Sequence, residues 1–356
     1  MSAGRVSLPR AFVLLAGILL GTAVQAAPLY RIIDLGLLPG GHGSQAAAIN
    51  RYGEVAGSAV TRHGVLRAVR WRPGHPPRNL GLLPGGHNSR GFGINVRGEV
   101  TGETGLRTGA ERAFIWSPRH GLRDLGTLGG RNSVGFGVNA HGAVTGTADT
   151  RKGHGHAFVW RPRHGMRDLG TLGGTSSDGI AINGYGDIVG QSRTRSGSMR
   201  AFIWTAQRGM TDLGTLGGRN SNATAIDERG AVTGAADTSG GTSHAFLWTP
   251  DDGMRDLGSL GGTSTGLGVN GRDEVVGMSM TANGGMRAFV WTPATGMRAL
   301  DGLIPRGSGW TLVMASAVNS RGQIVGVGSY RGEERAFLLT PLASPDRFRP
   351  VAEHTH

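Results

Sequence analysis

The sequence predicts an all-β fold, a seven-bladed β-propeller built from four-stranded antiparallel sheets. Three observations lead to it. A segment of about 44 residues recurs seven times, and it is clearest in the near-copies of "RDLGTLGG" that begin at Arg123, Arg167, Thr211 and Arg255. Each copy contains four short strand-like segments and no helical period. The chain also begins with one strand that its last copy lacks.

Three residue types mark the repeat at fixed positions. A tryptophan occurs in six copies and a leucine in the seventh: Trp71, Trp116, Trp160, Trp204, Trp248, Trp291 and Leu339. An asparagine or aspartate marks a turn: Asn50, Asn95, Asn139, Asn183, Asp227, Asn270 and Asn319. A glycine follows at Gly57, Gly102, Gly146, Gly190, Gly234, Gly277 and Gly326. No gap suggests a domain boundary, so residues 27–343 are treated as one repeat domain.

The copy at 134–170 shows how each unit should fold. "VGFGVN" alternates, and "NAHG" has the asparagine and glycine typical of the first and fourth places of a β-turn. "AVTGTA" forms the second strand, which runs back antiparallel to the first. "HAFVW" forms a third strand rich in aromatic and branched residues, and "MRDLG" forms the fourth. "RDLGTLGG" would then be an outer strand plus the crossover into the next blade. In that crossover Leu125 and Leu128 would anchor the chain, and Ser133 would bond the turn backbone.

The first strand of every copy has glycine or alanine on both sides of its middle residue, as in Gly135 and Gly137. In "HAFVW", Phe158 and Trp160 share one face because side chains alternate along a strand. We therefore expect these aromatic rings to fill the space that the small residues leave on the following sheet.

The two ends of the chain favour a closed ring over an open solenoid. The chain starts with a fourth strand, "LYRIIDLG" at 29–36, and ends with a third strand, "RAFLLT" at 335–340. The N-terminal strand would complete the last blade and remove both open sheet edges. An open β-solenoid would need capping repeats, and none is evident.

The first 26 residues predict a secretory signal peptide. Arg5 and Arg10 precede the apolar stretch "AFVLLAGILLGTAV", and Val24-Gln25-Ala26 fits cleavage before Ala27. The alternative is an uncleaved N-terminal anchor. We expect a secreted or periplasmic monomer with no transmembrane segment after cleavage, and a disordered tail at 344–356. The chain has no cysteine, which excludes disulfides and thiolate metal sites.

The repeats resemble those of the HAF-repeat family of extracellular bacterial proteins, named for a His-Ala-Phe core. That core is present at His156-Ala157-Phe158 and His244-Ala245-Phe246, and arginine replaces the histidine at Arg112, Arg200, Arg287 and Arg335. "LIPRGSGWTL" at 303–312 and "AFLLTP" at 336–341 are similar to the family's final unit. The resemblance implies an exported repeat protein and supplies no catalytic residues or cofactor.

Residues that vary between copies are better candidates for ligand binding than residues present in every copy. The crossovers and the loops between second and third strands should share one face of the propeller. The formal net charge is +13, and it is +11 without Arg5 and Arg10, since residues 1–26 hold no acid. The expected face is therefore basic, and its candidate ligand-binding residues are His42, His87, Arg131, Arg151, His154, Arg193, Arg219, Arg306 and Trp310. The alternative is a solvated rim without a ligand.

Metal binding, sugar stacking and catalysis have weaker support in the sequence. His42 and His87 share a phase in neighbouring copies, but no third ligand has a telling spacing, so no metal site is expected. Trp310 could stack on a sugar ring or fill the seam where the ring closes. No nucleophile elbow or paired base is evident, and no catalytic residue is assigned.

We expect a non-catalytic binding or scaffolding propeller whose ligand is an anionic glycan or another envelope component. A protein partner is compatible with it, and nucleic acid is not expected in an exported chain. The alternative is a propeller enzyme, a glycan hydrolase or lyase using the central funnel, with acids drawn from Asp149, Asp178, Asp237 and Glu333. A purely structural repeat within a larger assembly is a third alternative.

Overall fold

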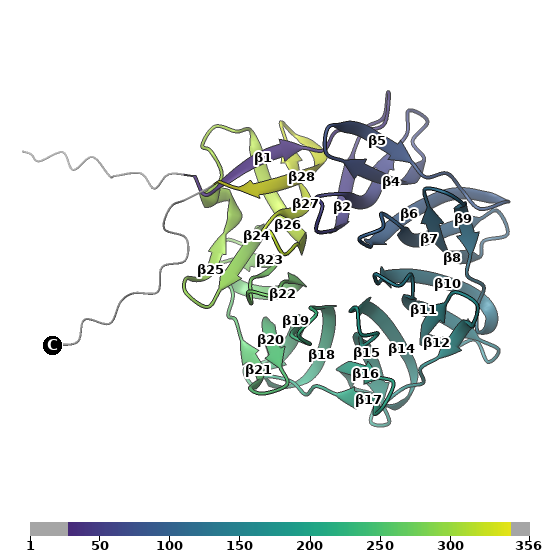
Figure 1. Ribbon diagram of the computed structural model, residues 1–356. Helices are drawn as coiled ribbons and strands as arrows, with labels where there is room; N and C mark the ends of the chain where they lie inside the picture. The colour runs from purple at the N-terminus through teal and green to yellow at the C-terminus, as the bar shows by residue number, and fades with distance from the viewer. Residues whose placement is uncertain (1–27, 343–356) are drawn as a thin grey trace, which may run out of the picture.

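The computed structural model describes residues 28–342. The predicted signal peptide and the tail at 344–356 lie outside this range. The described residues form seven four-stranded antiparallel sheets arranged as blades around a central channel (Figure 1), so the predicted seven-bladed β-propeller is confirmed. Among the described residues, no helix has the length and apolar character to cross a membrane.

The blades are numbered in chain order, and the strands of each are given from the channel outward. Blade 1 consists of β2 (Ser44–Ile49), β3 (Val55–Val60), β4 (Leu66–Arg72) and β5 (His75–Asn79). Blade 2 consists of β6 (Gly86–Ile94), β7 (Val100–Leu106), β8 (Glu111–Ser117) and β9 (Gly121–Asp124). Blade 3 consists of β10 (Gly129–Val138), β11 (Val144–Thr150), β12 (Gly155–Arg161) and β13 (Gly165–Asp168). Blade 4 consists of β14 (Gly173–Ile182), β15 (Ile188–Thr194), β16 (Met199–Thr205) and β17 (Gly209–Asp212). Blade 5 consists of β18 (Gly217–Ile226), β19 (Val232–Thr238), β20 (Ser243–Thr249) and β21 (Gly253–Asp256). Blade 6 consists of β22 (Gly261–Val269), β23 (Val275–Thr281), β24 (Met286–Thr292) and β25 (Gly296–Ala299). Blade 7 follows the short 3-10 helix η1 (Leu300–Leu303) and consists of β26 (Trp310–Val318), β27 (Ile324–Tyr330), β28 (Glu333–Pro341) and β1 (Tyr30–Asp34).

The N-terminal strand closes the ring as predicted. β1 pairs antiparallel with β28, from Tyr30 opposite Pro341 to Asp34 opposite Phe337, and the two strands lie side by side in Figure 1. Arg335 donates a hydrogen bond of 3.1 Å to Asp34 across the seam. The two ends of the chain therefore share one sheet, which leaves that blade with the same four strands as the others.

The crossovers behave as predicted, although the inner strands are longer than the alternation indicated. In blade 3 the inner strand begins at Gly129, because the chain turns at this residue (φ 99°) and then pairs with the end of β11. The hydroxyl of Ser133 donates to the carbonyl of Gly126 at 2.6 Å and accepts from the amide of Ala113 at 3.0 Å. One serine thus ties the crossover to the third strand of the preceding blade.

A β-bulge interrupts the inner strand of every blade at its middle residue. In blade 3 Gly135 pairs with Gly146 and Gly137 with Thr145, which leaves Phe136 as the extra residue. A bulge redirects its extra residue, and here it turns that side chain toward the ring centre. The same interruption occurs at Ala46/Ala48, Gly91/Gly93, Gly179/Ala181, Ala223/Ala225, Gly266/Gly268 and Ala315/Ala317.

The small residues that flank each bulge are needed for a different reason from the one expected. A Cβ on Gly135 would lie 2.4 Å from Oγ1 of Thr101 in the preceding blade. A Cβ on Gly137 would lie 3.1 Å from the carbonyl oxygen of Ile180 in the following blade. Glycine and alanine therefore let each inner strand approach the second strand of the preceding blade on one side and the inner strand of the following blade on the other.

The aromatic rings lie farther out than predicted and face the other neighbour. Phe158 and Trp160 pack with Leu125 against Ala113, which lies on the third strand of the preceding blade. The ring of Phe158 also covers Gly146 of its own blade. The predicted packing partner, the small residues of the following inner strand, is therefore wrong, whereas the predicted sharing of one face by Phe158 and Trp160 is confirmed.

The marker asparagines form a chain of hydrogen bonds around the channel. The Oδ1 atom of Asn139 accepts from the amides of His141 and Ala143, as the predicted turn requires, and its Nδ2 donates to the carbonyl of Asn183 at 3.1 Å. Five other asparagines donate to the next blade in the same way, including Asn319 to Asn50 across the seam. Asp227 has no amide to donate, and at that blade boundary Arg229 bridges Asp227 and Asp273.

Replacing Asn139 by aspartate is expected to lower the free energy of unfolding by about 1–3 kcal/mol, because a buried carboxylate oxygen would face the carbonyl of Asn183. Chemical denaturation of the purified variant measures this change. The reciprocal variant Asp227→Asn gains an amide at the one marker position without it but loses its ion pair with Arg229, so the two effects oppose each other and the loss is expected to be smaller than in Asn139→Asp. Equal losses in the two variants would show that the inter-blade amide bond contributes nothing.

Candidate ligand-binding face and central channel

The crossovers and the loops between second and third strands lie on one face, here called the crossover face. In blade 3 the beginning of β10 pairs with the end of β11, so the crossover that precedes Gly129 and the loop that follows Thr150 are adjacent. The asparagine turns and the turns between third and fourth strands lie on the opposite face, here called the turn face.

The predicted arginines of the crossover face are exposed, and four of them, Arg131, Arg151, Arg193 and Arg219, lie on the consecutive blades 3 to 5. Arg131 donates from Nη2 to the carbonyl of Thr108 at 2.6 Å, in the loop of the preceding blade. Arg151 lies against Gly129, two residues before Arg131. Arg131 is thus hydrogen-bonded to a loop backbone, the side chain of Arg151 packs beside the crossover glycine, and both residues are exposed.

The second pair joins blades 4 and 5, since Arg193 lies in β15 and Arg219 in β18. Arg193 donates to the carbonyl of Gly197 at 3.2 Å, and Arg219 donates from Nε to the hydroxyl of Ser198 at 3.3 Å. Because Gly197 and Ser198 are consecutive, Arg193 and Arg219 are held by the same loop. Further exposed cations of this face are Arg62, Arg107, Lys152 and Arg195.

The predicted histidines are exposed but are not gathered into a site. His42 lies before β2, His87 lies in β6 beside the Asn88 amide, and His154 lies in the loop before β12. His156 instead contacts Asp168 of its own blade at 2.9 Å, as does His244 with Asp256 at 3.0 Å. Within residues 28–342, no group of three or more histidine, aspartate and glutamate side chains could hold a metal ion.

Trp310 and Arg306 lie apart from the arginine pairs, at the crossover into blade 7. Arg306 is exposed, whereas Trp310 is partly buried at the start of β26. The Trp310 ring stacks on Tyr330 at 4.9 Å and meets Phe337 edge-on at 6.1 Å. The ring therefore makes the packing contacts expected of a residue that fills the seam of the last blade.

The four acids considered for catalysis each have a local partner. Asp149 accepts from Asn132 at 2.8 Å, and Asp237 accepts from Asn220 at 3.0 Å. Asp178 accepts from Thr147 and Gln191, and Glu333 pairs with Arg335. No two of these four carboxylates form a hydrogen-bonded pair in the described part of the chain.

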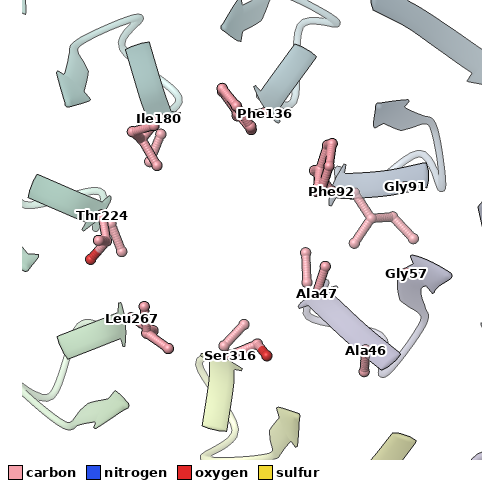
Figure 2. Close-up of a pocket in the computed structure, with 18 of the residues that line it drawn as sticks. Ala46, Ala47, Gly57, Gly91, Phe92, Phe136, Ile180, Thr224, Leu267 and Ser316 are labelled. Carbon is pink, nitrogen blue, oxygen red and sulfur yellow. The ribbon is translucent and has the colours of Figure 1, made fainter. Parts of the chain in front are cut away.

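The bulge residues form an apolar ring that the sequence analysis missed. A cavity of about 530 Å³ occupies the channel, and the extra residue of each blade points into it (Figure 2): Ala47, Phe92, Phe136, Ile180, Thr224, Leu267 and Ser316. Phe92 and Phe136 touch, with ring centroids 5.4 Å apart. The signal was present in the sequence, since these are the variable residues between the paired small ones.

Polar groups surround the apolar ring on the side toward the crossover face. Gln45 and Arg90 line the cavity there, and Arg90 contacts Glu103 at 3.3 Å. Burial raises the pKa of Glu103, the charge of Glu111 raises it further, and Arg90 opposes both. The channel thus combines a mainly apolar centre with polar side chains on the side of the crossover face.

No protein-family model and no curated protein matches the chain. Solved structures do match it in shape. A puromycin-hydrolyzing peptidase from Mycobacterium tuberculosis has a TM-score of 0.57 at 13% identity, with 88% of this chain and 51% of that chain covered. A second puromycin hydrolase has a TM-score of 0.52 at 15% identity, covering 86% and 53%. TolB from Acinetobacter baumannii has a TM-score of 0.49 at 12% identity, covering 81% and 63%.

The chain spans between half and two thirds of the length of these three proteins. At such low identity the similarity concerns the propeller fold alone, and a fold does not determine an activity.

Proposed function

We propose that this protein is an exported, non-catalytic binding propeller whose crossover face takes an anionic glycan or envelope component. The observation that carries this proposal is the grouping of Arg131, Arg151, Arg193 and Arg219 on adjacent blades of one face. Export rests on the N-terminal sequence pattern, and membership of the HAF-repeat family rests on the repeated His-Ala-Phe motif.

The geometry of the arginines supports an extended anionic ligand. Three of the four guanidinium groups are anchored on loops of this face, Arg131 on the loop of blade 2 and Arg193 and Arg219 on the loop of blade 4, and each anchor uses only some of the donors that arginine offers. Planar guanidinium groups suit the bidentate recognition of carboxylate and phosphate groups. A polymer that carries repeated anions could contact both pairs at once, which multiplies weak individual contacts.

The alternative, an enzyme that uses the channel, has less support. The channel surface is built mainly from apolar bulge residues, and each of the four candidate acids is bonded to a neighbouring side chain. Turnover of an exported glycan that survives substitution of all four acids would exclude their assignment as catalytic groups.

Binding of polygalacturonate, used as the anionic probe, is expected to weaken steeply as the salt concentration rises from about 20 to 150 mM, because exposed charges are screened over about 8–10 Å. Replacing Arg131, Arg151, Arg193 and Arg219 together by glutamine should weaken binding at least about tenfold at low salt, since each exposed ion pair contributes a few tenths of a kcal/mol or more. Isothermal titration calorimetry measures both effects.

The matched control replaces four exposed arginines of the turn face, Arg51, Arg72, Arg119 and Arg321, by glutamine. The two variants have equal net charge, so a difference between them reports the position of the charges. Equal affinity in both variants, or binding that does not respond to salt, would contradict the basic-face proposal. Dextran serves as the uncharged polymer and should not bind.

A further inference from the structure

A repeated arginine–tryptophan contact joins neighbouring blades near the turn face. The arginine before the aspartate or asparagine of the outer strand lies over the tryptophan of the next blade. The guanidinium-to-ring distances are 5.0 Å for Arg78 on Trp116, 5.0 Å for Arg123 on Trp160, 5.7 Å for Arg167 on Trp204 and 5.1 Å for Arg255 on Trp291. A cation over an indole ring at this distance is attracted by the electron density of the ring.

The boundary between blades 4 and 5 lacks this contact. Thr211 occupies the arginine position, opposite Ile203 in the same register in which Arg167 lies opposite Val159. The facing ring, Trp248, is partly exposed, whereas the other five repeat tryptophans are only 2–4% exposed. The short threonine side chain therefore leaves part of an indole ring uncovered.

A pocket of about 430 Å³ fills the place of the missing guanidinium, and it lies within the size range of ligand sites. Thr211 and Trp248 line it together with Tyr185, Asp187, Asp212 and Glu228. Thr211 and Asp212 are consecutive in β17, so their side chains point to opposite faces of the sheet and the Asp212 carboxylate faces away from the pocket. The pocket thus presents one indole ring, one phenol and the carboxylates of Asp187 and Glu228 along a groove between two blades.

The Asp187 and Glu228 carboxylates each keep one oxygen available for a ligand. Asp187 accepts from the Asn183 side chain at 3.2 Å, and Glu228 accepts from the amide of Gly184 at 2.8 Å. In each case one carboxylate oxygen is used, and the second accepts no hydrogen bond from residues 28–342.

Two arginines also line the pocket, and they have different surroundings. Arg229 is bound to Asp227 and Asp273, so its charge is already compensated. Arg208 is exposed at the rim, in the turn that follows β16. The carboxylates therefore outnumber the uncompensated cations in this pocket.

We propose that this pocket binds the guanidinium group of an arginine side chain from a partner polypeptide. The incoming guanidinium would lie over Trp248, as the chain's own arginines lie over the equivalent rings at four other blade boundaries, and would donate to the free carboxylate oxygens. The site is on the turn face, away from the crossover face, so it is independent of the proposed anionic ligand.

The probe is the peptide acetyl-Gly-Arg-Gly-amide, and the same peptide with citrulline is its uncharged isostere. Binding is followed by NMR through the indole N–H signal of Trp248, which the variant Trp248→Phe identifies. The arginine peptide is expected to shift this signal in a saturable way, and the citrulline peptide to bind at least tenfold more weakly. Equal binding of the two peptides, or no shift with either, would overturn the proposal.

The variant Thr211→Arg supplies from within the chain the side chain that the pocket lacks. It restores the residue found at four other boundaries, so we expect it to fold and to lower affinity for the arginine peptide at least tenfold. Thr211→Val is the matched control, because it keeps the size of threonine and should keep the affinity. Full binding by Thr211→Arg, or saturable binding of a neutral methyl glycoside at Trp248 in place of the peptide, would contradict an arginine site.

Discussion

Replacing Gly146 by alanine is expected to lower the free energy of unfolding by about 3 kcal/mol or more. A Cβ at this position would lie 1.9 Å from the carbonyl oxygen of Val134 and 2.9 Å from Cε1 of Phe158. One contact is with backbone and the other with a fully buried ring, so neither can yield without displacing a strand. Denaturant titration followed by tryptophan fluorescence measures the loss.

The same close contact recurs at the equivalent glycine of each blade, where a Cβ would lie 1.8–2.0 Å from a carbonyl oxygen. Gly271→Ala is the matched control, since its added methyl group would meet nothing within 4 Å and its φ is not positive. This control is expected to change stability by less than about 0.5 kcal/mol. A Gly146→Ala protein as stable as the control would refute the explanation for the glycine marker.

Deleting residues 28–36 is expected to lower the free energy of unfolding by more than about 3 kcal/mol and to cause association of the protein. The deletion removes β1 and with it Tyr30, Ile32 and Ile33, which pack in the cores on either side of blade 7. It also exposes the edge of β28, and an unpaired edge recruits other strands. Calorimetry and size-exclusion chromatography measure the two effects.

A synthetic peptide of residues 28–36, added in excess, should restore both the melting temperature and the elution volume of the truncated protein. A peptide with proline in place of Ile32 and Ile33 is the control, because proline donates no backbone hydrogen bond to a neighbouring strand. A truncated protein that stays monomeric and equally stable would show that the ring does not depend on β1.

The repeat and the unequal ends of the chain were sufficient to predict the blades, their order and the closing strand. Asn139 and Gly142 define a turn by their own chemistry, and Ser133 can satisfy a crossover backbone wherever it recurs. These features depend on neighbours within one repeat or on the copy next to it. A periodic sequence therefore shows them without any alignment.

The packing around Gly135 and the apolar channel could not be derived from the same pattern. Strict alternation assigns Phe136 to one face of a flat strand, whereas the bulge between Gly135 and Gly137 turns it toward the ring centre. A bulge changes the count of residues by one, and the alternation of apolar and polar residues does not show where the extra residue lies. The repeat pattern also does not show that Thr211 leaves Trp248 uncovered, because the arginine–tryptophan contact joins two different copies of the repeat.

The pairing of Asp34 with Arg335 links residues 301 positions apart in the chain. A contact between such distant residues forms slowly, because the loop entropy is lost before the contact gives any gain. Blades 1 to 6 have all their own strands and can form in order during synthesis, while the first strand must wait for the last to emerge. The pairing of β1 with β28 is therefore expected to be the late kinetic step of folding. Mutations in β1 should accelerate unfolding more than they slow the folding of the earlier blades.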